Sequence, residues 1–241
     1  MTETNMRIWS QVDKTAPSAT KAAKVGGMNI TALNGLHMIM RATEVLGPVG
    51  IGWGWKVLEE RFDQGAPIMG GKDGAEVVSP TLSHTVRIQF WYKLDGERGE
   101  FEQYGCTKAV YKSSYGASTD DEAPKKSLTD AIKKSLSMLG FSADVYLGLF
   151  DDKEYVEQRK DEEALETAED KSAEEDRQKQ ERLDYIKSVL GGMQGAVTLH
   201  ELKKLHDVAV RKLTAKRDTQ AVTRIARELA ELSEKFKEQA A

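Results

Sequence analysis

Residues 83–112, SHTVRIQFWYKLDGERGEFEQYGCTKAVYK, decide the fold. From 83 to 94, apolar or aromatic side chains alternate with mostly polar ones, which is the period of a β-strand with one buried face. Asp95-Gly96 then predicts a two-residue hairpin turn, because both residue types tolerate the positive φ angles that such a turn needs. Residues 97–112 return as the second strand, so we expect an antiparallel hairpin.

A further strand precedes this hairpin and makes it a meander. In residues 49–58, Val, Ile and Trp alternate with Gly and Lys, again with a period of two. Residues 63–80, between this strand and the hairpin, are rich in Gly and Pro and are predicted to form a loop. Residues 31–46 have the pattern of an amphipathic helix, whereas residues 1–29 show no period and are predicted to form an irregular arm.

An amphipathic helix is predicted after the meander, over residues 119–139. Thr119 and Glu122 have the spacing of a capping box, Pro124 is tolerated in a first turn, and Gly140 is a natural stop. The elements together predict an α+β fold. Its β-β-β-α core is an antiparallel β-meander packed on helices, and an α-helical C-terminal region follows.

Lysines lie on the side of this helix that is opposite its leucine stripe. Lys126, Lys133 and Lys134, with Ser137, share that side. When the apolar face of a helix is packed on the protein, ammonium groups on its other side can bind successive phosphates of a nucleic acid without contacting the bases. The solvated face of any exposed helix also carries lysines, so this feature alone leaves both interpretations open.

The end of the last strand interleaves tyrosines with lysines. Tyr104 and Tyr111 alternate with Lys108 and Lys112. This pattern suits single-stranded nucleic acid, because every base has a face that can stack and every nucleotide carries a charge. The alternative is an ordinary strand whose tyrosines pack while its lysines remain in water.

The sequence contains few residues that indicate a catalytic site or a metal site. Cys106 is the only cysteine and there are four histidines, which argues against a structural zinc site and for a reducing compartment. Glu100 and Glu102 share a strand face and suggest a metal-dependent nuclease, but no partner carboxylate that would converge with them is identifiable. We expect a protein that is not an enzyme and uses no cofactor or metal. An apolar leader and a bilayer-spanning stretch are both absent, which predicts no membrane association.

Charge is distributed unevenly along the chain. Residues 1–150 hold 17 Lys and Arg against 17 Asp and Glu, residues 151–176 hold 4 against 13, and residues 177–241 hold 14 against 9. We therefore expect a domain at 30–155, an acidic connector at 156–176 and a helical region at 177–241.

Three stretches resemble a known family in their residues and their order: ATEVLGPVGIGWGWKV (42–57), EQYGCTKAVYKS (102–113) and KKSLTDAIKKSLSMLGFSADVYLGLFDD (125–152). They are similar to the Rad-fifty-two-like superfamily of single-strand annealing proteins, which includes the Sak and Erf proteins of phages. The resemblance covers residues 30–155.

The resemblance implies a β-β-β-α core, ring or spiral homo-oligomers, and single-stranded DNA in a positively charged groove with its bases outward. By position, Lys133 and Lys134 match two adjacent basic residues of the family's DNA-binding helix. Ser137 and His37 stand where the eukaryotic members have basic residues, so this chain departs from the family there. The lysines that could compensate are Lys108, Lys112 and Lys126.

We therefore expect single-stranded DNA binding and strand annealing in phage-type homologous recombination, in the cytoplasm of a bacterial host. The expected DNA-binding residues are Lys133, Lys134, Lys126, Lys108, Lys112, Tyr104, Tyr111 and His37. An alternative is an adaptor that binds single-stranded DNA and recruits a host or phage replication or recombination protein through residues 177–241. A weaker alternative is the nuclease.

Overall fold

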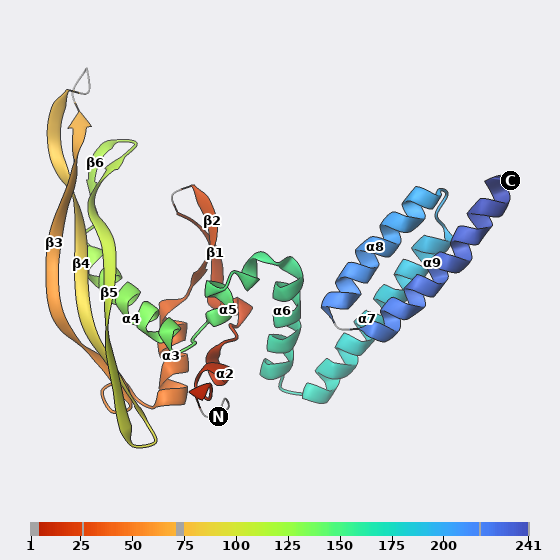
Figure 1. The fold of residues 1–241 in the computed structure, drawn as a ribbon, viewed down its shortest axis with the longest axis horizontal. Helices are drawn as coiled ribbons and strands as arrows, with labels where there is room; N and C mark the ends of the chain where they lie inside the picture. Colours follow the sequence, from red (N-terminus) through yellow and green to blue (C-terminus); the bar gives the residue numbers. More distant parts are fainter. Residues whose placement is uncertain (1–4, 26, 71–74, 217, 241) are drawn as a thin grey trace. The chain divides into compact units, whose positions relative to one another are not determined.

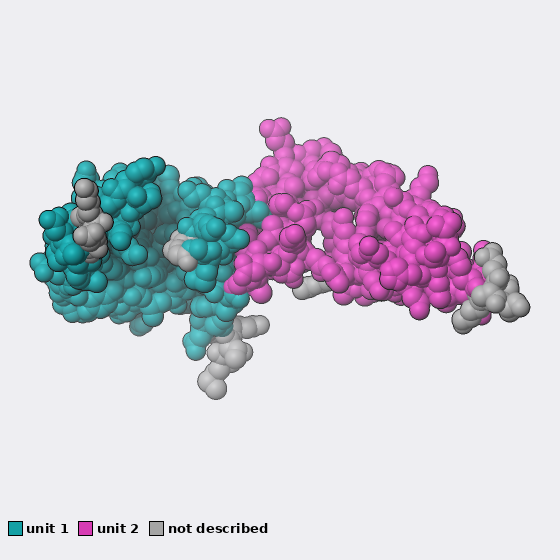
Figure 2. Space-filling view, turned by 90° about the horizontal axis from the view of Figure 1, so that it is seen from above, with its two compact units in different colours: residues 1–147 teal, residues 148–241 magenta. Residues whose placement is uncertain are grey.

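The chain forms two compact units, residues 1–147 and residues 148–241 (Figure 2). The division falls before the domain boundary predicted after residue 155. Each unit has an apolar core of its own. The computed structural model describes residues 5–25, 27–70, 75–216 and 218–240.

The first unit is built on a curled antiparallel sheet (Figure 1). Its strands follow the order β3-β4-β5-β6 and are Trp53–Gly70, Glu76–Leu94, Glu97–Ser113 and Gly116–Thr119. Asp95 and Gly96 join β4 to β5 with φ angles of 52° and 84°, as a two-residue turn requires. The predicted α+β class, with a meander followed by C-terminal helices, is confirmed.

Two strand boundaries differ from the prediction. Residues 63–80 were predicted to form a loop, but they extend β3 and β4 as far as Gly70 and Glu76. Register shifts interrupt this ladder, and the two prolines of the segment lie opposite each other, so bulges accommodate residues that a regular ladder would exclude. Residues 71–74 of the segment lie outside the described part. β3 begins four residues later than predicted because those residues form a hydrogen-bonded turn.

Helix α4, Ala123–Met138, packs directly on β5 (Figure 1). Its buried side carries small residues at every fourth position: Ala123, Ser127, Ala131 and Ser135. A Cβ atom at Gly105 of β5 would lie 1.9 Å from the Ser127 carbonyl oxygen, so a glycine is needed at this crossing. The Ser127 hydroxyl donates a hydrogen bond to the carbonyl of His84 at 3.0 Å. The helix backbone is therefore fixed against two strands.

The predicted start of this helix at Thr119 is wrong. Thr119 ends β6, where it pairs with Val110, so it is not available as a helix cap. Glu122 occupies the N-cap position and makes no capping hydrogen bond through its side chain. Pro124 lies in the first turn and Gly140, with φ of 100°, follows the helix end, both as predicted.

The N-terminal arm was predicted to be irregular, but it contains regular structure. The elements are α2 (Trp9–Val12), η1 (Pro17–Ala19), β1 (Thr20–Val25) and β2 (Met28–Leu33), and the two strands form an antiparallel hairpin. Met28 and Ile30 are 69% and 41% exposed, so little of the hairpin is buried. A strand shows alternating apolar and polar residues in its sequence only when one of its faces is buried, so this hairpin has no such pattern. Residues 1–4 and 26 of the arm lie outside the described part.

A buried carboxylate anchors the N-terminal segment. Asp144, in the short helix α5 (Ala143–Tyr146), accepts hydrogen bonds from the backbone N–H and the hydroxyl of Thr15 at 2.8 and 2.5 Å. Helix α3, Gly35–Leu46, follows β2 and is capped by the side chain of Asn34. Side chains from α3, α4 and the sheet form the core of this unit.

The second unit is helical. Its elements are η2 (Leu149–Asp151), α6 (Lys153–Thr167), α7 (Lys171–Gln194), α8 (Leu199–Ala215) and α9 (Thr219–Ala240). Thr198 caps α8, since its side chain accepts a hydrogen bond from the Glu201 N–H at 3.1 Å. Gly191 and Gly192 are residue types that favour a helix end, but α7 continues through both, because burial of Leu190 and Met193 outweighs the low helix propensity of glycine.

No helix in the described ranges is long and apolar enough to cross a bilayer.

Candidate nucleic-acid interface

The lysines predicted on α4 are mounted on a rigid helix, but two of them have acidic partners. The Lys126 ammonium lies 2.6 Å from Asp120, and this hydrogen bond raises the pKa of the lysine. The Lys134 ammonium lies 2.7 Å from Asp130, one turn earlier on the same helix. Both lysine side chains are about half exposed, so a phosphate in water can compete for either cation.

Lys133 has a different environment from its neighbour. Its ammonium group donates a hydrogen bond to the carbonyl of Leu33, the last residue of β2, at 3.2 Å. Burial lowers the pKa of this lysine. Gly35, at the start of α3, lies close to the Thr129 methyl group and the Lys133 side-chain stem. Lys133 therefore joins α4 to the end of the β1–β2 hairpin.

The structure brings Lys126 and Lys133 together on one side of α4. Both line a shallow depression, to which Lys125 and Thr129 also contribute. Tyr111 lies near enough to Lys126 to contribute to its raised pKa. His37 is partly exposed on α3, whose first turn packs against this part of α4.

Two of the remaining predicted residues, Tyr104 and Lys108, lie on the other face of the sheet, and Lys112 lies beyond a register shift in β5. Gly105 faces α4, and side chains alternate along a strand, so Tyr104 and Lys108 point away from the helix. Tyr104 is 46% exposed, and Lys108 and Lys112 are also exposed. Within the described ranges neither lysine has an ion-pair partner. The predicted set is thus divided between two faces of one sheet.

The carboxylates that suggested a nuclease are held by neighbouring side chains. Glu100 accepts hydrogen bonds from Gln89 and Arg98 at 2.9 and 3.0 Å, and Glu102 accepts one from Arg87 at 3.1 Å. They belong to a cross-strand ladder of opposite charges on the face away from α4. The described residues contain no group of three or more metal-ligating side chains.

Sequence reasoning missed two features of the N-terminal segment. The first is the pair of exposed lysines on β1, Lys21 and Lys24, which had been assigned to an irregular arm. The second is the buried contact between Asp144 and Thr15, which fixes the segment leading into the hairpin. The Ser-Ala-Asp triplet that opens α5 was the available signal for the second, because aspartate is rarely buried without a partner.

No family model, curated protein or solved structure matches this chain. The resemblance to the Rad-fifty-two-like superfamily therefore stays a prediction that these comparisons do not support.

Proposed function

We propose that this chain binds single-stranded DNA through its first unit and anneals complementary strands. The observation that supports it most is the backbone contact between Gly105 and Ser127, which holds the lysines of α4 at fixed positions on the sheet. Lysines held in this way neutralise phosphates and release counterions, and the bases stay free to pair. No bond is made or broken in this reaction.

Lys108 and Lys112 provide a second group of cations. Tyr104 lies on the same face as Lys108 and offers an exposed ring on which a base can stack. These lysines have no acidic partner in the described ranges, so they bind a phosphate without first breaking an ion pair.

We further propose that copies of the chain assemble into a ring or spiral in the cytoplasm of a bacterial host. β3 lies at one edge of the sheet and is 18 residues long, so its outer backbone groups are available for pairing. Exposed apolar side chains on this strand, Val57, Leu58 and Phe62, add a surface that a second copy would cover.

An adaptor role is the second candidate. The helices of residues 148–241 form a core of their own, which is what a partner-binding module requires. The exposed side chains of Val197 and Val208 provide an apolar surface for a host or phage replication or recombination protein.

The experiment combines DNA binding with strand annealing. Lys108→Gln with Lys112→Gln should weaken binding to an oligonucleotide of any sequence, and should reduce the salt slope by about 0.7 for each phosphate that is no longer neutralised. Lys56→Gln with Lys93→Gln removes the same charge from exposed positions elsewhere on the sheet and serves as control. Failure of the wild-type protein to bind or anneal oligonucleotides at low ionic strength would overturn the proposal.

A further inference from the structure

Among the described residues, no side chain of helix α6 belongs to the apolar core of its own unit. That core is formed by side chains from α7, α8 and α9 and the segments that join them. The residue of α6 that is fully buried is Arg159, which pairs with Glu162 on the same helix. α6 therefore needs another kind of contact to stay on the bundle.

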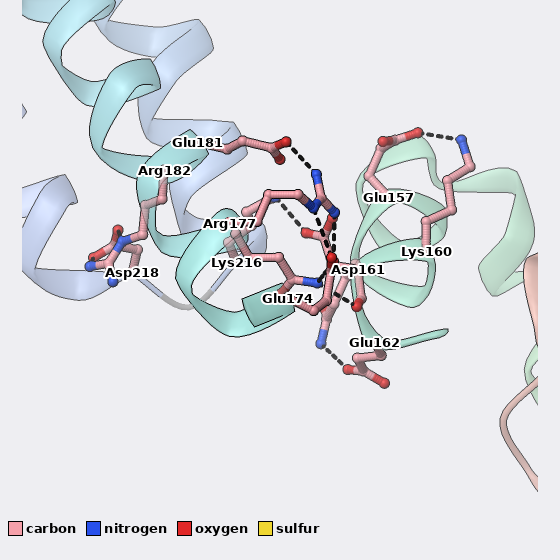
Figure 3. Close-up of polar contacts among 12 residues, drawn as sticks. Glu157, Lys160, Asp161, Glu162, Glu174, Arg177, Glu181, Arg182, Lys216 and Asp218 are labelled. Carbon is pink, nitrogen blue, oxygen red and sulfur yellow. Dashed lines mark hydrogen bonds and ion pairs between the residues drawn. The ribbon is translucent and has the colours of Figure 1, made fainter. Parts of the chain in front are cut away.

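Charged groups provide that contact (Figure 3). Asp161 of α6 pairs with Lys216 at the end of α8 at 2.5 Å, and its carbonyl accepts a hydrogen bond from Gln178 of α7 at 2.9 Å. Glu157 has a lowered pKa because Lys160 bonds to it and because Lys216 and Lys212 lie nearby. The acidic side of α6 thus faces cations of the bundle.

The packing under α6 is also incomplete. A cavity of about 630 Å³ lies between α6 and the bundle, and Asp161 and Glu162 line it opposite Lys179 and Lys216. A second depression brings Arg211 of α8 next to Asp152 and Glu154, at the start of α6. The cavity under α6 is open to solvent, and its lining combines charged and amide side chains with Leu165 and Leu213, so water enters it and α6 is loosely packed on the bundle.

We propose that α6 is an internal polyanion, and that the face of α7 and α8 beneath it is a second binding site for single-stranded DNA. This inference rests on the proposed function. Carboxylates and phosphates compete for the same cations, so α6 and a DNA strand exclude each other from this face. The cations concerned are Lys179, Arg211, Lys212 and Lys216.

An aromatic ring lies beside one of these cations. The Lys212 ammonium lies 4.3 Å from the centre of the Tyr185 ring. A ring beside a row of cations is the combination that suits single-stranded nucleic acid, because bases stack while phosphates bind. While α6 is bound, its carboxylates cover these cations. Release of α6 exposes the cations and the ring, and the exposed surface adds affinity for DNA.

The test compares two double variants of the full-length chain. In the release variant, Asp161→Asn removes the carboxylate that pairs with Lys216, and Glu157→Gln removes a carboxylate that is bonded to Lys160 and lies near Lys212 and Lys216. Glu166→Gln with Glu169→Gln makes the same change of charge at exposed positions in the same acidic segment. Affinity for a labelled oligothymidylate is measured for both variants and the wild type, and hydrogen exchange of residues 153–167 reports the release of α6.

The release variant should bind about tenfold more tightly than the control variant, since it frees Lys216 and removes a negative charge near Lys212, so both cations can contact phosphates. Its α6 amides should exchange faster. Adding Lys212→Gln and Lys216→Gln should remove the gain. Equal affinity of the two double variants, with the wild type binding DNA, would overturn this inference alone. Absence of binding by all the proteins at low ionic strength would instead overturn the proposed function on which it rests.

Discussion

Replacing Gly105 with alanine tests the contact that mounts α4 on the sheet. The new Cβ would lie 1.9 Å from the Ser127 carbonyl oxygen and 2.6 Å from the Ala131 nitrogen, both in the helix backbone. Ordinary contact begins at 3.4 Å, so α4 must move by about 1.5 Å. Overpacking of this kind typically costs about 1–3 kcal/mol, and the shift also loosens Ile132 and Leu136. We expect unit 1 to lose about 3 kcal/mol of unfolding free energy.

Gly191→Ala is the matched control in the second unit. Nothing lies within 4 Å of a Cβ built at Gly191, which is inside α7. Alanine is a better helix former than glycine by about 1 kcal/mol, so this variant should be more stable.

Urea unfolding followed by two signals measures both effects. The four tryptophans, Trp9, Trp53, Trp55 and Trp91, belong to the first unit, so their fluorescence reports its unfolding separately. Far-ultraviolet circular dichroism reports the helices of both units. An unchanged tryptophan transition in the Gly105→Ala protein would refute the direct contact between α4 and β5.

Two further substitutions and one titration test individual contacts. Asp144→Ala should destabilise the first unit by about 3 kcal/mol, because it leaves two buried donors of Thr15 unsatisfied; an unshifted tryptophan transition would contradict this. The Lys133 amine should lose its proton at a lower pH than exposed lysines in an NMR titration of lysine side chains. The charged form is penalised in the folded state, so the penalty is complete below the folded pKa and disappears as pH rises above it. Asp218→Ala should destabilise the second unit by about 2 kcal/mol, measured by circular dichroism, because Arg182 loses its partner and α9 loses a cap.

The sequence predicted the helices and strands that are determined by residues close together in the chain. The meander follows from the alternation around Asp95-Gly96, and α4 follows from its apolar stripe and from Gly140. The extension of β3 and β4 through residues 63–80 was missed, because bulges let a long hairpin contain glycine and proline that usually indicate a loop. The β1–β2 hairpin was missed because it is exposed on both faces.

The candidate site was less predictable than the fold. The role of Lys133 depends on Leu33, which is 100 residues away in the chain, and no local pattern reports such a contact. The division of the lysines between two faces depends on Gly105 facing α4. The helical wheel could assign Lys133 and Lys134 to one ridge, but it could not show that one is half-buried and the other exposed.

Among the described residues, the two apolar cores are made of different side chains. Each half has an apolar core of its own, so selection can alter the packing of the helical half while the sheet and its lysines are kept. A random mutant library would then sort into two classes, each losing one unfolding transition and retaining the other.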